Sequence, residues 1–570
     1  MHLSEIKAGM HGVAYTVFEG TKPEPMEVTI LGILYNAIGP KTDMILVRLG
    51  GAKAEYTGVV AGMSGSPVYI DGKLIGALAF RIGSFSKDPI AGVTPIDDML
   101  EISELDHSIP AEGVVKDASK NDGSAATKTG MTAENFAPGQ PVQSVYNYMK
   151  PIDTPLVFSG FSEDTVQRFA SQFSSAGIVP VMGVGGAEIN KPQPDPIVPG
   201  SAISAILVSG DMNITATCTV TYMDADHLLA CGHPLMQFGM VDMPMTKAEV
   251  VATLASPLNA FKIVNATEVV GSFVQDRHTG IMGRFGRTSE MIPVSLSIHG
   301  GPQEKIFHFG VMNNAKLTPV AIMSTVFQAL QGTNEFGDNV TYRMHGVISV
   351  NGHPDVTMSD MFAPGEAQPT AFNAAILLGN RFTSIYENPL RQPEIKGVDL
   401  VFDIIPERRS ATLETARTDV TEARPGDELT IEAVLRPYRG ERIMRQIHVK
   451  IPTSSPKGTL RILVSDGDTL DRIHRVAPTM ARKMDIESMI AVLNRQHNNH
   501  SLYVSLLESN PQAMIEDKIM PSLPLSMMNV MDGMRGTQEM IVTGESAMNE
   551  SSTPLDYVVS GAQLVTVQVK

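Results

Sequence analysis

Cysteine, positive charge and long apolar runs are all scarce in this chain of 570 residues. Two cysteines exclude a disulfide-rich scaffold and a four-cysteine zinc module. No stretch approaches the roughly 18 uncharged apolar residues of a transmembrane helix, so we expect no membrane span. The 61 acidic residues outnumber the 44 Lys and Arg, for a net charge of −17. This balance argues against a nucleic-acid partner and against a polybasic membrane anchor.

Glycine (49) and proline (37) are frequent, and the apolar runs are short and β-branched, which predicts a mainly β fold. Residues 66–70 and 73–80 are predicted strands of a hairpin, because Asp71-Gly72 suits a turn with two positive φ angles. A second hairpin is predicted for 214–222 with 227–231. Helices are expected at 162–175 and, with Asp485 as N-cap, just after residue 485.

At roughly 150 residues per domain the length predicts about four domains. The small polar residues around 114–143 indicate a flexible linker, and two alternating segments, 429–435 and 447–451, are typical of half-buried sandwich strands. The expected regions are 1–107 (serine-bearing barrel half), 108–149 (linker), 150–290 (histidine-bearing barrel half), 291–405 (accessory β), 406–455 (sandwich-like β) and 456–570 (mixed α/β).

The most specific local pattern is Gly62-Met63-Ser64-Gly65-Ser66-Pro67. A serine between glycines on a tight turn can expose its hydroxyl while the flanking backbone N–H groups point at a developing oxyanion. An ordinary Gly-Ser turn between two strands remains the alternative for this pattern.

A second pattern places a histidine directly after an apolar strand, in Cys231-Gly232-His233-Pro234. Histidine is the usual general base for a serine nucleophile because its pKa lies near neutrality. The alternative is a loop histidine with no chemical role.

Together the two segments resemble the sporulation stage IV B (SpoIVB-type) serine peptidases. Residues 9–18, 62–67 and 71–77 are similar to the serine half of that family, and 219–233, 268–271 and 280–283 to its histidine half. The resemblance covers roughly 1–100 and 195–290. It implies a bacterial, chymotrypsin-like endopeptidase with two β-barrel halves, whose substrate is a protein or peptide and which needs no cofactor or metal.

Carried over residue by residue, the resemblance makes Ser64 the nucleophile and His233 the general base, with the N–H groups of Gly62 and Ser64 forming the oxyanion hole. The chain departs from the family because the serine half comes first, because no PDZ module follows, and because the family's aspartate before the serine is missing. Asp276, 43 residues after His233, is the first choice for the third triad member. Asp242 and Asp43 are the reserves.

Counting six residues back from the nucleophile places Gly58 at the base of the primary specificity pocket, which predicts an apolar P1 side chain. If the second hairpin turns on Asp224-Ala225, Cys218 and Cys231 face each other across it and can form a disulfide.

His227, Cys231, His233 and Asp224 form an alternative, a zinc site. A catalytically silent peptidase-like scaffold is the alternative to the enzyme as a whole. We expect an extracytoplasmic location, in the cell envelope or secreted, with the signal peptide absent from this chain; the sequence leaves the oligomeric state open.

Overall fold

The computed structural model describes residues 1–82, 88–104, 149–175, 180, 186–187, 191–237, 239–256, 260–301, 303–365, 368–388, 393–473, 485–508, 512–515, 518–520, 523–531, 540–543 and 546–570. The chain forms two compact units, Met1–Met291 and Ile292–Lys570. The fold is mainly β, as predicted. The predicted linker, 108–149, lies outside the described residues except at its last position.

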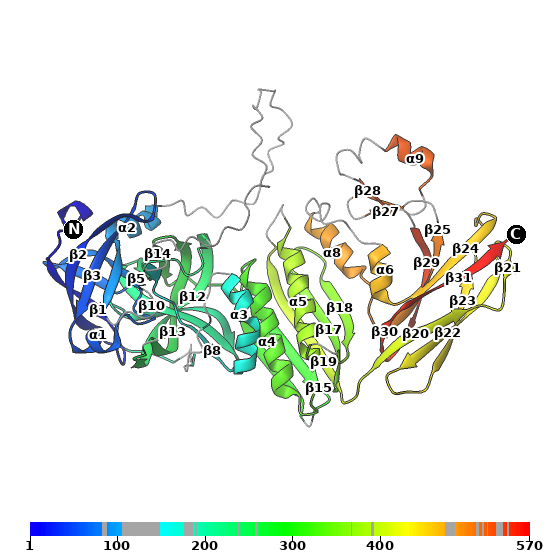
Figure 1. The fold of residues 1–570 in the computed structure, drawn as a ribbon, viewed down its shortest axis with the longest axis horizontal. Helices are drawn as coiled ribbons and strands as arrows, with labels where there is room; N and C mark the ends of the chain where they lie inside the picture. The colour runs from blue at the N-terminus through cyan, green and yellow to red at the C-terminus, as the bar shows by residue number, and fades with distance from the viewer. Residues whose placement is uncertain are drawn as a thin grey trace. The chain divides into compact units, whose positions relative to one another are not determined.

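The first unit begins with a closed antiparallel barrel of six strands (Figure 1). Its order is β4-β1-β2-β3-β6-β5, and the β4–β5 pair closes it. Asp71 (φ 50°) and Gly72 (φ 73°) make the predicted hairpin turn between β4 and β5. The strands are β1 (His11–Thr16), β2 (Glu24–Gly39), β3 (Thr42–Gly50), β4 (Pro67–Ile70), β5 (Lys73–Ile82) and β6 (Ile90–Pro95).

A second six-stranded antiparallel barrel in this unit has the order β9-β12-β13-β14-β11-β10, closed by the β9–β10 pair. If β9 to β14 are numbered one to six, each strand pairs with the same numbered neighbours as β1 to β6 do in the first barrel. The chain therefore uses one barrel topology twice. The strands are β9 (Ala202–Gly210), β10 (Asn213–Met223), β11 (His227–Ala230), β12 (Gly239–Leu254), β13 (Phe261–Arg277) and β14 (Gly280–Phe285).

Short elements border the two barrels. β7 (Met149–Pro151) pairs with β5, and β8 (Leu156–Ser159) pairs with β10. Helix α3 (Glu163–Ser175) confirms the prediction for 162–175, and two unpredicted helices are α1 (Ala52–Thr57) and α2 (Ile96–Glu104).

The second unit contains a sheet of order β18-β17-β19-β15-β16, in which β15 and β19 run parallel and β17 is antiparallel to both β18 and β19. Helices α4 and α5 lie side by side, α4 against β16 and α5 against β17 and β18 (Figure 1). The elements are β15 (Met291–His299), β16 (Lys305–Met312), α4 (Leu317–Thr333), β17 (Thr341–Val350), β18 (Val356–Phe362), α5 (Thr370–Tyr386) and β19 (Ile395–Ile405).

The rest of the second unit is a β-sandwich with one shared hydrophobic core. Its sheets have the orders β23-β22-β20-β30 and β21-β31-β24-β25-β29. Residues 406–455 and 456–570, expected as separate regions, both contribute side chains to this core. The strands are β20 (Ser410–Arg417), β21 (Glu422–Ala423), β22 (Glu428–Pro437), β23 (Ile443–Lys450), β24 (Gly458–Ser465), β25 (Ser501–Glu508), β29 (Ser546–Pro554), β30 (Val558–Ser560) and β31 (Ala562–Val569).

Three further helices and a small sheet are described in this unit. Helix α8 (Ile486–Asn494) begins as predicted, because the Asp485 carboxylate accepts a hydrogen bond from the Ser488 N–H at 2.7 Å. The other elements are α6 (Gly467–Ile473), β26 (Gln512–Ile515), β27 (Lys518–Met520), α9 (Leu525–Val530) and β28 (Met540–Thr543). Within the described residues, no helix is both long and apolar enough to cross a membrane.

Candidate active site

Ser64 lies on a tight loop between α1 and β4. Gly62 and Gly65 both have φ of +94°, a conformation that favours glycine. At Gly65 the space is also closed, because a Cβ atom there would lie 1.9 Å from the Thr219 carbonyl oxygen. The Gly65 N–H donates to the Leu78 carbonyl at 2.7 Å, which holds the loop against β5. The two glycines around Ser64 are therefore required by geometry.

Three polar groups of this loop make no hydrogen bond with the described residues. Ser64 is fully buried, and its Oγ atom has no hydrogen-bond partner. The backbone N–H groups of Gly62 and Ser64 also make no hydrogen bond within the described part of the chain. Buried polar groups normally find partners, so an unpaired hydroxyl beside two unpaired N–H donors is typical of a site built for another molecule.

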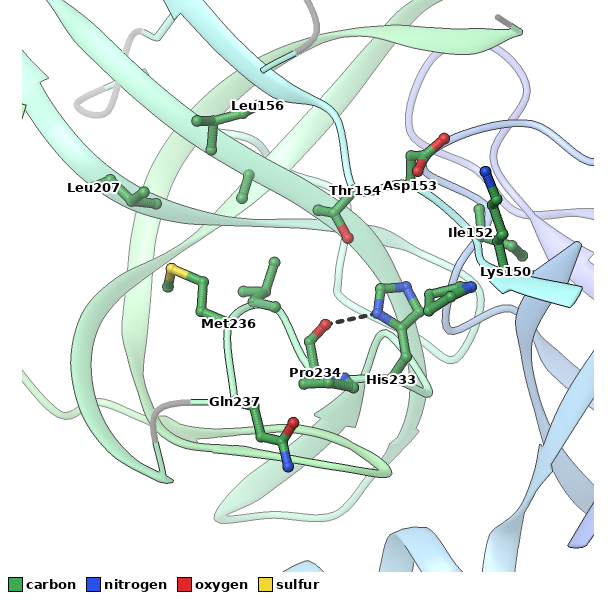
Figure 2. A pocket seen from close by; sticks show the side chains of 13 residues that line it. Lys150, Ile152, Asp153, Thr154, Leu156, Leu207, His233, Pro234, Met236 and Gln237 are labelled. Carbon is green, nitrogen blue, oxygen red and sulfur yellow. Dashed lines mark hydrogen bonds between the residues drawn. The ribbon is translucent and has the colours of Figure 1, made fainter. Parts of the chain in front are cut away.

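His233 follows β11 and is 3% exposed. Its Nδ1 atom lies 2.7 Å from the Pro234 carbonyl oxygen (Figure 2). A carbonyl can only accept, so Nδ1 carries the proton and Nε2 keeps its lone pair. Nε2 has no partner. Burial lowers the pKa of His233, although the backbones of Pro234 and Ile152 and the Asp153 carboxylate act in the opposite direction. The imidazole is therefore held neutral, with its basic nitrogen available.

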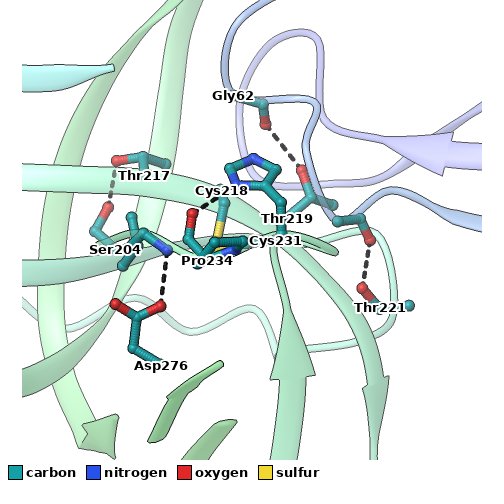
Figure 3. Close-up of a disulfide and its surroundings, with 12 residues drawn as sticks. Gly62, Ser204, Thr217, Cys218, Thr219, Thr221, Cys231, Pro234 and Asp276 are labelled. Atoms are coloured by element: carbon teal, nitrogen blue, oxygen red, sulfur yellow. Dashed lines mark hydrogen bonds between the residues drawn. A yellow bond between two sulfur atoms is a disulfide. The ribbon is translucent and has the colours of Figure 1, made fainter. Parts of the chain in front are cut away.

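Hydrogen bonds tie the serine loop to β10, the strand that pairs with β11 before the histidine (Figure 3). The Thr219 N–H donates to the Ser64 carbonyl at 2.7 Å, and the Thr219 hydroxyl donates to the Gly62 carbonyl at 3.0 Å. The Thr221 hydroxyl donates to the Gly65 carbonyl at 2.8 Å. The structure thus brings the two predicted segments together, although no hydrogen bond joins Ser64 Oγ to His233 Nε2. Sequence reasoning missed both threonines, since alternate threonines on a strand carry no specific signal.

Asp276, the first choice for the triad aspartate, lies at the end of β13 and is fully buried. Its carboxylate oxygens accept from the N–H groups of Leu235 and Met236, each at 2.8 Å. His233 Nδ1 is bonded to the Pro234 carbonyl and Nε2 has no partner, so neither nitrogen is hydrogen bonded to Asp276. Asp276 therefore holds the loop that carries the histidine and does not orient the imidazole ring itself.

The two reserve aspartates are engaged elsewhere. Asp242 accepts from the Ser272 hydroxyl at 2.7 Å, and Asp43 accepts from the Asn36 N–H at 2.9 Å. Gly58, the predicted pocket residue, ends helix α1 with φ +69° and does not line the cavity beside His233.

Lys262 is a buried group beside the serine loop that sequence reasoning missed. It is fully buried, its Nζ donates to the Thr16 hydroxyl at 2.7 Å, and a Cβ atom at Gly62 would lie 3.2 Å from its Cδ. Burial lowers its pKa to about 7. A single lysine gives no sequence signal for burial. The aliphatic part of its side chain packs against Gly62.

His233 also lines a cavity of about 370 Å³ in the first unit. Figure 2 shows the imidazole on one side, with Thr154 and Ile152 nearby and the loop of Pro234, Met236 and Gln237 on the other. The remaining lining residues are Lys150, Pro151, Asp153, Leu156, Leu207, Ala216 and Leu235.

Cys218 and Cys231 form a disulfide with a Cα–Cα distance of 5.3 Å, a bond that the sequence allowed but left open (Figure 3). The register assumed for that pairing is wrong, because the ladder pairs Met223 with Leu228 and Val220 with Ala230, with a bulge between Val220 and Tyr222. The bond also overturns the zinc alternative, since a disulfide sulfur is not a thiolate ligand. His227 instead pairs with Asp224 at 3.0 Å.

Comparison with known families adds to this geometry. Residues 2–100 match the family of SpoIVB peptidase S55. This match confirms the resemblance for the part of the chain that carries Ser64, and the S55 fold is chymotrypsin-like, in agreement with the barrel. It supports a serine peptidase. Searches of curated proteins and of solved structures gave no match.

Proposed function

We propose that the chain is a serine endopeptidase in which Ser64 is the nucleophile and His233 the general base. One observation carries the proposal: Ser64 Oγ and His233 Nε2 are both buried and unpartnered, and the backbones of Ser64 and Cys231 both hydrogen bond to Thr219. The S55 match over residues 2–100 supports the same reaction class. The histidine half at 195–290 and the swapped order of the halves are part of the proposal.

In the proposed reaction, Ser64 Oγ attacks the scissile carbonyl while His233 Nε2 takes its proton. The oxyanion then accepts from the free N–H groups of Gly62 and Ser64. His233 returns the proton to the leaving amine, which leaves an acyl-enzyme, and water activated by the same nitrogen releases the acyl group. The Pro234 carbonyl keeps the imidazole in the required tautomer throughout.

A protein or peptide is the substrate under this proposal. An extracytoplasmic location, in the envelope of a bacterial cell or secreted, is supported by the Cys218–Cys231 disulfide, because such bonds persist in oxidising compartments.

A fluorophosphonate probe tests the proposal. We expect an adduct on Ser64, located by peptide mass spectrometry, that disappears in Ser64→Ala. Ser66→Ala is the matched control, because the Ser66 hydroxyl is already bonded to the Met63 carbonyl at 2.7 Å and should not react. Absence of any adduct on Ser64 both in the wild type and in Ile152→Asp, under conditions that label trypsin completely, would instead favour the catalytically silent scaffold.

A further inference from the structure

The edge of β5 next to the candidate site is covered by another piece of the same chain. β5 last pairs with β4 at Ala77, and beyond that point β7 takes the vacant edge in antiparallel register. Phe80 pairs with Pro151 and Arg81 with Lys150. The Ile152 N–H continues the ladder by donating to the Ala79 carbonyl at 2.8 Å. Adding an extended strand to a free sheet edge is how many proteins bind peptides.

The covered edge leads directly to the reacting groups. Leu78, the residue before Ala79, accepts from the Gly65 N–H at 2.7 Å. On the other side, a Cβ atom at Gly232 would lie 3.1 Å from the Ala79 Cβ. Ala79 therefore lies between the serine loop and the histidine loop, and Ile152 is hydrogen bonded to Ala79.

Ile152 fills an apolar position in the core of the first barrel. It is fully buried and belongs to the hydrophobic cluster that includes Val60 and Met63, the residues around Gly62. Its backbone lies against the His233 ring, as Figure 2 shows.

The residues after Ile152 keep the segment in place. The Asp153 carboxylate pairs with the Arg81 guanidinium, and both side chains are largely buried. The Thr154 hydroxyl is buried without a partner, like Ser64 Oγ and His233 Nε2. Ser64 itself has no exposed surface.

We propose that residues 149–153 are a built-in occupant of the substrate groove, bound as the acyl side of a peptide substrate would bind. Ile152 takes the place of the side chain before the scissile bond. The groove then selects extended peptides with a branched aliphatic residue at that position, and a substrate reaches Ser64 only after the segment leaves. This inference rests on the proposed function for the identity of the groove.

The first experiment compares fluorophosphonate labelling rates of the full chain and of Ile152→Asp. A carboxylate is costly in an apolar pocket, so the segment should leave and labelling should accelerate at least tenfold. Ile6→Asp is the matched control, because Ile6 is 5% exposed in the same cluster but belongs to neither loop. Equal rates in the wild type and Ile152→Asp, or the same acceleration in Ile6→Asp, would overturn the proposal.

A second experiment requires no catalysis. A fluorescein-labelled peptide with the sequence of residues 149–155, Met-Lys-Pro-Ile-Asp-Thr-Pro, is titrated into Ser64→Ala and into Ser64→Ala/Ile152→Asp. We expect at least tenfold tighter binding to the double variant, and loss of that binding when the peptide isoleucine is replaced by aspartate. Equal affinity for both proteins, or no binding to either, refutes the occupant. Selective binding to the double variant with no probe adduct in any variant would retain the occupant and reject the peptidase.

Discussion

Replacing Lys262, on β13 of the second barrel, by methionine removes a buried positive charge that faces the first barrel while keeping a side chain of similar length. Among the described residues the ammonium has one hydrogen-bond partner, the Thr16 hydroxyl, and no carboxylate pairs with it. Burial lowers its pKa to about 7 from an ordinary value of 10.5. We expect Lys262→Met to change the pH dependence of stability in a direction that follows from this shift.

Between pH 7 and about pH 10.5 the unfolded chain holds a proton on Lys262 that the folded chain has lost. Stability therefore rises with pH across this window, and below pH 7 the penalty for the buried charge is complete. Each pKa unit corresponds to about 1.4 kcal/mol, so the wild type should lose about 3 kcal/mol of unfolding free energy between pH 9 and pH 6 through this group alone. Lys262→Met should lack that loss. The titration of His233 is common to both proteins and cancels in the comparison.

The chain contains no tryptophan, so Tyr15→Trp on β1 supplies a single fluorophore in the first barrel. Urea unfolding at pH 6, 7.5 and 9 is compared for the reporter protein with and without Lys262→Met. Lys247→Met is the matched control, because the Lys247 ammonium already lies 2.6 Å from the Glu268 carboxylate. The reasoning is refuted if the reporter protein and Lys262→Met lose equal stability from pH 9 to pH 6, or if Lys247→Met abolishes the loss equally.

Four further predictions concern the candidate site. Burial lowers the pKa of His233 from its ordinary value of 6.5, so the fluorophosphonate labelling rate should fall with decreasing pH at a midpoint below 6.5. A midpoint of the pH–rate curve above 6.5 would contradict this. Asp276→Asn weakens two charge-assisted hydrogen bonds of about 1.5–3 kcal/mol each, so labelling should slow about tenfold with an unchanged pH midpoint, and a shifted midpoint would indicate direct contact with the imidazole. Gly65→Ala cannot fit its Cβ, so circular dichroism should show a lower melting temperature and labelling should be lost; wild-type values for both would refute the geometry. Removing the Cys218–Cys231 bond should cost about 3 kcal/mol in urea unfolding, and two titratable thiols in the denatured, unreduced wild type would show that the bond does not form.

Local patterns predicted the elements whose determinants are adjacent in the chain. The Asp71-Gly72 turn and the Asp485 N-cap were found because a turn conformation and a capping carboxylate act within four residues. Helix α4 was missed for a physical reason. Most of its residues are buried, so it has no polar face to give the sequence a helical period.

The site was predictable in its parts but not in its connections. Spacing placed Asp276 in the correct region of the second barrel, near the loop of His233. Spacing could not say whether the carboxylate points to the ring or to the backbone of that loop, because this depends on where the chain between them turns. The same limit explains the disulfide, since one bulge changed the register without separating the cysteines. The burial of Lys262 could not be predicted, because it comes from contact with Thr16 and Gly62 of the first barrel.

The orientation of His233 has a consequence for the proposed chemistry. An acceptor for the Nδ1 proton is sufficient to fix the tautomer, and the Pro234 carbonyl meets that need. A neutral carbonyl is a weaker partner than a carboxylate for the imidazolium that forms during attack, since hydrogen bonds between charged groups are roughly twice as strong. Burial adds to this cost by disfavouring the charged ring. The Asp153 carboxylate is the described charge that favours the imidazolium, and it belongs to the segment proposed to leave when substrate binds. A substrate with an acidic residue directly after its scissile bond would restore that charge, so we expect such peptides to be cleaved faster than their amide counterparts. Paired peptides that differ only by aspartate or asparagine at this position measure the effect, and equal kcat values for the two would refute it.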